Sequence, residues 1–180
     1  MTTLQSLDIE GCYIFNPEIH SDERGLFVKH LEQSILRDLE LDISSMYLCT
    51  ATNLEKGTLR GLHFQESPFE ETKIVRCSQG ECFDVLVDFR PKSDTYLKWV
   101  GINLKSESFS SIIVSPGIAH GYITLTDNCV LEYFICGEFN QDAQKGIRWN
   151  DPAVSVNWPL LPTVVSSRDA QFPLLNLEVQ

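Results

Sequence analysis

The sequence lacks the features that mark several common functional classes. Its 180 residues contain no apolar run near the roughly 18–20 residues needed to span a bilayer. The first residues, MTTLQSLDIEG, show no basic stretch followed by an apolar one, so no secretory signal is expected and the cytoplasm is the expected location. Basic residues are few, with 14 Lys and Arg against 25 Asp and Glu and a formal net charge of −11. Such an acidic chain is a poor match to nucleic acid or an anionic membrane, so neither is an expected partner.

Cysteine pairs with metal-ligand or redox spacing are also missing. The six cysteines are scattered along the chain, and none forms a C-x-x-C pair. Scattered cysteines in a cytoplasmic chain are typically small buried apolar residues. The sequence has no linker, low-complexity tract or internal repeat, and a chain of this length can bury a core without disulfides or metal. Residues 1–180 are therefore expected to form a single domain.

The sequence does contain a series of short β-rich segments. Residues 32–41 place Ile35, Leu36 and Leu39 on one face and predict a short N-terminal helix. The later segments, separated by turn residues, predict strands at 74–77, 82–88, 99–104, 111–114, 118–124 and 130–136. Strands at regular spacing without intervening helices favour an all-β sandwich or jelly roll. Residues 149–180 hold four of the eight prolines and predict an irregular C-terminal segment over the core.

Two of the four histidines lie in unusual runs. His63 lies in LRGLHFQ and His120 in PGIAHGY. Strand alternation places His63 and Gln65 on one face, with Leu62 and Phe64 on the other, which suggests a polar pocket. A hydrogen-bonded core histidine is the alternative interpretation.

A metal-dependent barrel enzyme is a further alternative. A small-barrel metal site typically has two histidines on one strand face, as in H-x-H, with a carboxylate nearby. Here Gln65 stands where the second histidine would be, although Glu70 and Glu71 follow and His120 could contribute from another strand. One histidine and one amide form a weak ligand set, so no metal is expected.

Charged residues and one tyrosine near these runs could act on a substrate. Arginine is suited to bidentate contacts with the oxygens of a diphosphate. The candidate cations are Arg24, Arg60, Lys73, Arg76 and Arg90, and for the last two a solvated surface charge is the favoured interpretation. Tyr133 shares a strand face with Leu131 and Ile135, so it is either a core residue or, if it reaches the cavity of His63, a general acid.

Taken together, the motifs resemble a known family. They follow in order as D-E-R-G-x-F from Asp22, L-R-G-L-H-F-Q from Leu59, T-K at 72–73, D-V-L-V-D-F-R from Asp84, S-D-T-Y from Ser93, P-G-I-A-H-G-Y from Pro116, Tyr133, G-I-R-W-N-D-P from Gly146, W-P at 158–159 and S-R-D at 167–169. This series covers nearly the whole chain and resembles the nucleotide-sugar 4-keto-hexose epimerases typified by dTDP-4-dehydrorhamnose 3,5-epimerase. The resemblance implies a cupin-like jelly-roll barrel, a homodimer and no metal or other cofactor.

The implied reaction inverts carbons next to a ketone in a nucleotide-linked 4-keto-6-deoxy sugar, at C3, C5 or both. By resemblance His63 is the base, Asp169 orients it, and Tyr133 returns a proton to the opposite face. Lys73 is the candidate for stabilising the enolate oxygen. The substrate-binding candidates are Arg24, Phe27, Arg60, Gln65, His120 and Phe139.

Several positions depart from the family pattern. Lys29 stands where a Glu is usual, Phe139 where a second Tyr is common, Gln144 where a Glu occurs and Arg168 where a Lys occurs, and residues 48–52 also differ. These positions face the nucleotide in the family, so the nucleotide stays open, whereas the residues assigned to the chemistry are all present. A sugar-nucleotide-binding barrel without catalytic activity is the alternative from a different class.

Overall fold

The computed structural model describes residues 2–176, which form two β-sheets with few helical residues. The first sheet is ordered β1-β2-β10-β7-β12-β5 and the second β13-β6-β11-β8-β9, with β14 paired to β6. The strands of the first sheet are β1 (Thr3–Ser6), β2 (Tyr13–Asn16), β10 (Ser111–Val114), β7 (Thr72–Gln79), β12 (Cys129–Cys136) and β5 (Met46–Asn53). Those of the second are β13 (Gln144–Gly146), β6 (Thr58–Gln65), β11 (Ile118–Thr124), β8 (Glu81–Asp88), β9 (Trp99–Lys105) and β14 (Val164–Val165).

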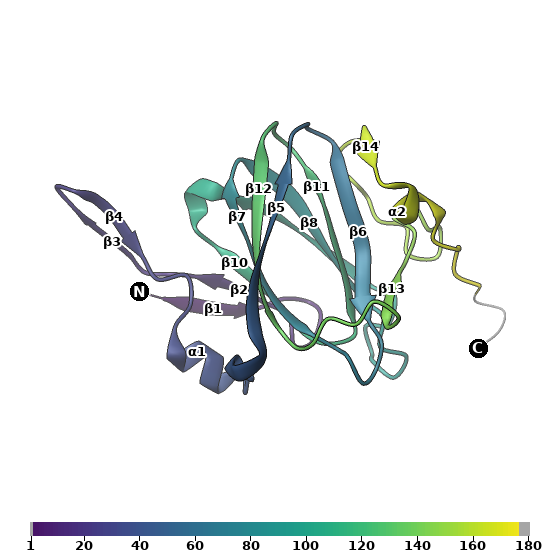
Figure 1. The fold of residues 1–180 in the computed structure, drawn as a ribbon, viewed down its shortest axis with the longest axis horizontal. Helices are drawn as coiled ribbons and strands as arrows, with labels where there is room; N and C mark the ends of the chain where they lie inside the picture. Colours follow the sequence, from purple (N-terminus) through teal and green to yellow (C-terminus); the bar gives the residue numbers. More distant parts are fainter. Residues whose placement is uncertain (1, 177–180) are drawn as a thin grey trace.

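A separate hairpin and four short helical segments complete the described chain. The hairpin is β3 (Ile19–Asp22) and β4 (Gly25–Val28), and the helical segments are α1 (Gln33–Asp38), η1 (Ile43–Ser45), η2 (Ser106–Ser108) and α2 (Ser167–Gln171). Figure 1 shows the hairpin projecting at one end of the molecule, with β14 and α2 at the other. In the part of the chain that the structure describes, no helix is long and apolar enough to cross a membrane.

The main core lies between the two sheets. Buried side chains of the first sheet, including Val75 and Leu131, pack there against Leu86, Leu104 and Ile118 of the second. The alternation of strand residues explains this layer, because every second residue of β7, β8 and β12 points inward. Apolar burial of this kind is the main favourable contribution to folding.

The outer face of each sheet has its own cover. Apolar residues of α1 and its flanks, Ile35, Leu36 and Leu39, pack on Phe15 and Ile74 of the first sheet. On the second sheet the C-terminal segment buries Leu62, Val85 and Val87, using residues that include Ile147, Val154 and Trp158. Both covers pack on outer faces only. The space between the two sheets stays open at one end, where the polar residues gather.

Most of the predicted elements are present. The six predicted strands correspond to β7 through β12, and the helix predicted at 32–41 is α1. The C-terminal segment is irregular except for two short elements that the sequence analysis missed, β14 and α2. Its prolines prevent longer pairing, but Val164 and Val165 align parallel to Thr58 and Leu59 of β6. The first sheet, the second sheet and their covers account for a mostly β protein.

Candidate functional site

A cavity of about 840 Å³ opens between the two sheets. Its walls come from β5, β7 and β12 of the first sheet and from β6 and β11 of the second, while β14 and α2 close one side. The cavity collects most of the polar side chains that the sequence analysis selected. Those that line it are His63, Asp169, Tyr133, Lys73, Arg60, His120 and Phe139.

His63 and Asp169 form a hydrogen-bonded pair in this cavity. His63 Nε2 lies 2.7 Å from Asp169 Oδ1, and Asp169 Oδ2 accepts a hydrogen bond of 3.1 Å from the backbone N–H of Gly61. Because a carboxylate can only accept, the hydrogen of the neutral His63 ring lies on Nε2 and the lone pair on Nδ1. Nδ1 is therefore the atom that can take a proton from a substrate.

The environment of Asp169 keeps its carboxyl group ionised. Burial opposes ionisation, but hydrogen bonds from His63, from the Gly61 backbone and from Ser166 outweigh it, so the pKa of Asp169 lies below its ordinary value. An ionised Asp169 orients the His63 ring and favours the imidazolium that forms when His63 accepts a proton. This pair has the arrangement of a general base with its positioning carboxylate.

The C-terminal segment brings Asp169 to His63 from 106 residues away in the sequence. Pairing of β14 with the start of β6 fixes the direction of the chain. Ser166 then caps α2, because its side chain accepts a hydrogen bond of 3.0 Å from the Asp169 N–H. The cap, the strand pairing and the Gly61 contact together hold the carboxylate beside the histidine ring.

The face of β6 differs from simple alternation at Gly61. His63 pairs with His120, but Arg60 rather than Gly61 pairs with Tyr122, so the register shifts between them. Gly61 has a φ of 126°, and a Cβ on it would lie 2.5 Å from the Gly121 Cα, so a side chain is excluded there. As a result Arg60 and His63, an odd number of residues apart, both reach the cavity, which strict alternation does not predict.

Tyr133 faces the cavity from the first sheet, whereas His63 faces it from the second. Its ring makes an edge contact with His120, at 6.0 Å between ring centroids. Burial raises the pKa of Tyr133 well above its ordinary value, and negative charge on Tyr122 and Asp84 would raise it further. Tyr133 therefore holds its proton near neutral pH, as a proton donor must.

Two cationic side chains lie in the same cavity as these groups. Lys73 is almost buried and its Nζ lies 2.9 Å from Glu71 Oε1. Arg60 donates through Nε to Asn53 Oδ1 at 2.9 Å. Together they supply positive charge at two places along the cavity wall, suited to an enolate oxygen or a phosphate.

His120 has its own carboxylate partner, Asp84, which the sequence analysis did not select. His120 Nε2 lies 2.9 Å from Asp84 Oδ2, and both side chains are buried. Burial raises the pKa of Asp84, while the charges of His120 and Lys73 oppose the rise. Among the residues described, Asp84 Oδ1 has no hydrogen-bond partner. The sequence shows an aspartate within one apolar strand and a histidine within another. That the two strands are neighbours, and that the two side chains meet, is known only from the strand pairing.

Gln65, which is predicted to bind substrate, donates through Nε2 to Oε2 of the cavity-lining residue Glu71 at 3.2 Å. Gln65 is 3 % exposed and does not line the cavity. Its Nε2 donates to Phe69 O at 2.7 Å and to Glu138 O at 3.1 Å, while its Oε1 accepts from the Asn140 N–H at 2.8 Å. The amide thus joins two loops at the end of β6, and its contact with substrate stays a prediction.

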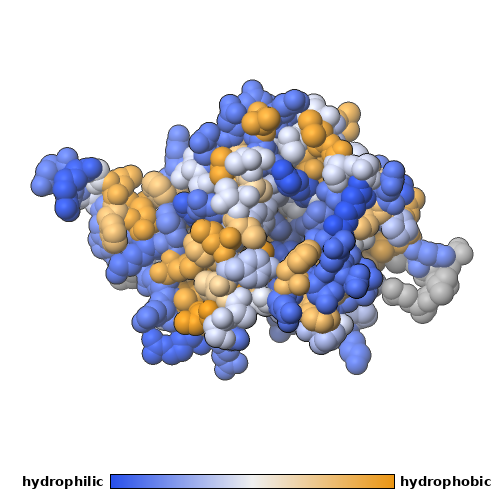
Figure 2. Space-filling view, viewed as in Figure 1, coloured by the Kyte–Doolittle hydropathy of each residue, from blue (hydrophilic) through white to orange (hydrophobic). Residues whose placement is uncertain are grey.

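Arg24 and Phe27 are not brought to the cavity of their own chain. Both lie on the projecting hairpin, where the Arg24 side chain is 83 % exposed and ion-paired to Asp22. Phe27 is also exposed, together with Leu26 and Ile19. Figure 2 shows the hydrophilic tip of the hairpin and the apolar surface next to it. Hence the predicted contact of these residues with substrate does not arise within one chain.

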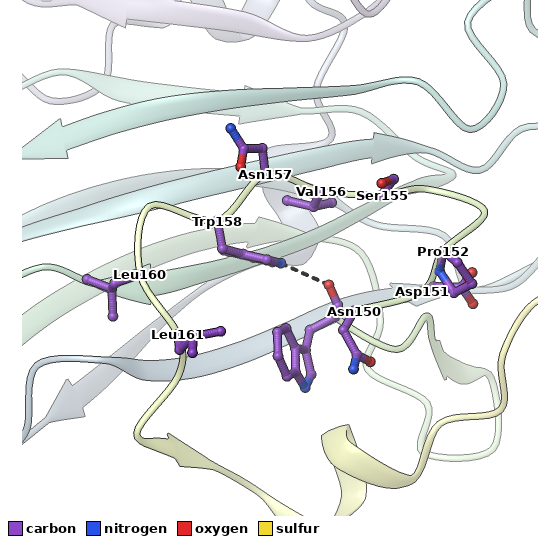
Figure 3. A pocket seen from close by; sticks show the side chains of 10 residues that line it. Asn150, Asp151, Pro152, Ser155, Val156, Asn157, Trp158, Leu160 and Leu161 are labelled. Atoms are coloured by element: carbon purple, nitrogen blue, oxygen red, sulfur yellow. Dashed lines mark hydrogen bonds between the residues drawn. The ribbon is translucent and has the colours of Figure 1, made fainter.

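A second cavity of about 400 Å³ lies in the C-terminal segment (Figure 3). The Trp158 indole N–H donates to Trp149 O at 2.8 Å on one side of it. Asp151 is the sole ionisable group among the residues that line it, and its two oxygens accept from the backbone N–H groups of Ala153 and Leu175. This cavity offers no free acid or base, so the candidate active site is the one that contains His63.

In residues 2–176 no group of three or more His, Cys, Asp and Glu side chains is arranged to hold a metal ion. The larger cavity holds acid–base groups on two of its walls, His63 with Asp169 on one and Tyr133 on the other. They can remove a proton on one side of a bound molecule and return one on the other.

Comparison with known proteins gives consistent matches along the chain. Residues 6–176 match the family model described as dTDP-4-dehydrorhamnose 3,5-epimerase. The protein of that name from Sinorhizobium fredii is 37% identical over 172 residues, covering 95% of this chain and 88% of the relative. A dTDP-4-dehydrorhamnose 3-epimerase from Streptomyces niveus is 33% identical over 177 residues, covering 96% and 83%. The crystal structure of dTDP-4-dehydrorhamnose 3,5-epimerase from Bacillus anthracis with TDP and PPi bound superposes with a TM-score of 0.91 at 30% identity, covering 97% and 100%.

Proposed function

The chain belongs to the dTDP-4-dehydrorhamnose 3,5-epimerase family, and on this premise we propose that it inverts one or both carbons next to the ketone of a dTDP-linked 4-keto-6-deoxyhexose. It is an epimerase, and thus an isomerase, of deoxysugar biosynthesis. The observation that carries the proposal is the placement of His63 with Asp169 on one wall of the cavity and Tyr133 on the other.

The first step is removal of a proton next to the ketone. Such a proton is weakly acidic, so its removal needs a positioned base and stabilisation of the enolate oxygen. His63 Nδ1 accepts the proton, and Asp169, 2.7 Å from Nε2, stabilises the resulting imidazolium. The C–H electron pair moves into the enolate, whose negative charge rests on the C4 oxygen.

Lys73 is the group that we assign to this oxygen. It is a cation that lines the cavity and is shielded from solvent, so its attraction for the enolate is weakly screened. Its ion pair with Glu71 keeps the ammonium group in place before substrate arrives. His120, held by Asp84, offers its second ring nitrogen to the same region of the cavity.

Inversion follows when Tyr133 returns a proton from the opposite wall. The Tyr133 O–H bond breaks, its proton bonds to the enolate carbon, and the C4 ketone forms again. Because His63 and Tyr133 belong to different sheets, the removed and the added proton occupy opposite faces of the sugar ring. Arg60 and Phe139 also line the cavity. We assign Arg60 to the diphosphate of the substrate and Phe139 to its nucleobase.

Deuterium exchange tests the proposed function directly. The protein is incubated in D₂O with dTDP- and GDP-linked 4-keto-6-deoxyhexoses, and the position of the label is read by NMR. We expect deuterium next to the ketone with the dTDP sugar, at C3 and C5 for a double epimerase or at C3 alone for a 3-epimerase. Binding without exchange would support a barrel without catalytic activity, and activity lost in chelator would support a metal enzyme.

The projecting hairpin supports the further proposal that the protein is a homodimer. Arg24 and Phe27 match positions that contact substrate, yet both lie outside the cavity of their own chain. An exposed apolar hairpin of this kind is typical of a segment that packs on a partner. We therefore propose that the hairpin completes the cavity of a second copy.

Mixing two inactive variants tests this arrangement. Arg24→Ala is expected to lower kcat/KM about 10- to 100-fold, because a charge-assisted contact is lost. After mixing with His63→Asn and subunit exchange, about half of the dimers are mixed and one of their two sites is intact, so roughly a quarter of wild-type kcat/KM should return.

The matched control mixes His63→Asn with Tyr133→Phe. Both residues belong to the cavity of one chain, so no mixed dimer contains an intact site and activity should stay low. A mixture of Arg24→Ala and His63→Asn that also stays inactive, despite proven subunit exchange, would contradict the partner's contribution.

The fold supports two finer proposals. Two facing sheets with a cavity at one open end are the arrangement of a cupin-like jelly-roll barrel, and the apolar clusters between and outside the sheets belong to one chain without a linker. We assign residues 1–180 to one such domain. A single cooperative unfolding transition is the result that this assignment requires.

A further inference from the structure

Proton donation by Tyr133 leaves a phenolate inside the cavity. That charge is unfavourable where it forms, because the side chain is partly buried and desolvation disfavours its ionised form. The titratable groups that act on Tyr133 are Tyr122, Asp84 and Cys82, and the ring of His120 lies at 6.0 Å. Of these, an ionised Asp84 would add to the negative charge, whereas hydrogen bonds with Cys129 and Cys77 and burial raise the pKa of Cys82 well above its ordinary value and keep it a thiol. The group that can relieve the negative charge is a hydrogen-bond donor aimed at the phenolate oxygen.

Tyr122 is placed to be that donor. It lies on β11, is 1 % exposed and lines the same cavity. Tyr133 packs against the core cluster that contains Tyr122, and the Tyr122 hydroxyl group donates a hydrogen bond of 3.1 Å to Asn53 Oδ1. Since a phenol has one hydrogen, Tyr122 cannot donate to Asn53 and to Tyr133 at the same time. In the resting state it therefore donates to Asn53.

Asn53 is built to release this bond without being left unpaired. Its Oδ1 also accepts from Arg60 Nε at 2.9 Å, and its Nδ2 donates to Cys129 O at 3.1 Å. Asn53 is 2 % exposed, so these contacts fix its orientation. If the Tyr122 hydroxyl turns away, Asn53 Oδ1 keeps Arg60 as its partner and no buried acceptor is orphaned.

We propose that Tyr122 is a positioning residue whose hydroxyl turns from Asn53 to the Tyr133 phenolate when Tyr133 protonates the substrate. This inference rests on the proposed function. In the step, the Tyr133 O–H electron pair stays on oxygen, the proton forms the new C–H bond, and the Tyr122 O–H donates to the phenolate. The cycle closes when Tyr133 regains a proton and His63 releases one to solvent.

The arrangement also links the acid to a substrate-binding cation. Arg60 and Tyr122 share the acceptor Asn53 Oδ1, and the charge of Arg60 acts on Tyr122. The positive guanidinium group therefore supports the phenolate through a short chain of dipoles. Tyr122 acts on Tyr133 and not on the reacting carbon.

The test compares Tyr122→Phe with a matched control, Tyr13→Phe. Tyr13 lies on β2 and packs against the outer core of the first sheet, away from the cavity. Each protein is assayed for net inversion and for deuterium incorporation from D₂O. We expect Tyr122→Phe to slow inversion about 10- to 100-fold, as for loss of a hydrogen bond to a charged group, while exchange by His63 stays near wild type. Tyr13→Phe should leave both unchanged.

A second comparison separates positioning from general damage. In a Tyr133→Phe background, where no phenolate forms, adding Tyr122→Phe should cause no further loss of inversion or exchange. Equal loss of exchange and inversion in Tyr122→Phe would overturn the proposal, as would unchanged inversion or a further loss in the Tyr133→Phe background. Failure of the proposed function would appear differently, as absence of both exchange and inversion in the wild-type protein.

Discussion

Replacing His63 by Asn is expected to remove both deuterium exchange and inversion, with kcat about 10²–10⁴-fold below wild type. Asn is smaller than His and polar, so the cavity keeps a polar side chain at this position, but the Asn amide cannot accept a proton from carbon. Because proton removal precedes every later step, no enolate forms and no label enters the sugar. NMR of the sugar in D₂O measures both effects in one sample.

His30→Asn is the control for this variant. His30 lies outside the cavity and contacts Arg76, so its loss should not change turnover. A loss of less than about tenfold in His63→Asn would mean that another group is the base. Equal losses in both variants would point to damage to the fold.

Replacing Tyr133 by Phe is expected to separate exchange from inversion. His63 can still remove a proton, exchange it with solvent and return deuterium to the same face, so labelled but uninverted substrate should accumulate. Inversion should fall about 10²–10⁴-fold, the usual contribution of a general acid, because the opposite wall no longer carries a donor. Time courses of label and of product configuration distinguish the two rates.

The contrast with His63→Asn tests the assignment of His63 as the base and Tyr133 as the acid. Two residues in one cavity are expected to give different products of partial reaction, which a general loss of folding would not produce. If Tyr133→Phe abolished exchange as completely as inversion, Tyr133 would be required for proton removal and the assignment as acid would be wrong. The Tyr13→Phe variant serves again as the control for loss of a phenol outside the cavity.

Strands β7 to β12 could be predicted from the sequence because their signal is local, whereas β1 to β5 and β13 were not predicted. The runs at 82–88 and 118–124 are mostly apolar because both faces of these strands are largely buried, and the turn residues between the segments mark their ends. The motif around His63 also identified the residues of one cavity wall. Short strands such as β14 carry no such periodicity, because two residues cannot display one.

The site details that sequence reasoning missed depend on pairing between distant segments. The register shift at Gly61 follows from the close approach of Gly121, which alternation within β6 does not reveal. Asn53 joins Arg60 and Tyr122 through contacts across three strands. Gln65 illustrates the reverse case, since a polar residue in a functional motif became a tie between loops. The sequence shows which side chains exist, whereas the contacts decide their use.

The position of Asp169 has a consequence for how the protein is made. A ribosome releases the chain from its N-terminus onward, and compact units can fold as they emerge. Both sheets apart from β14, and the cavity walls with His63 and Tyr133, are synthesised before Asp169 and its capping residue Ser166. The barrel can therefore assemble while its base still lacks a carboxylate. Full reactivity is acquired only when the segment that carries Ser166 and Asp169 docks, so a nascent chain holds a cavity whose base lacks its carboxylate until that segment has emerged.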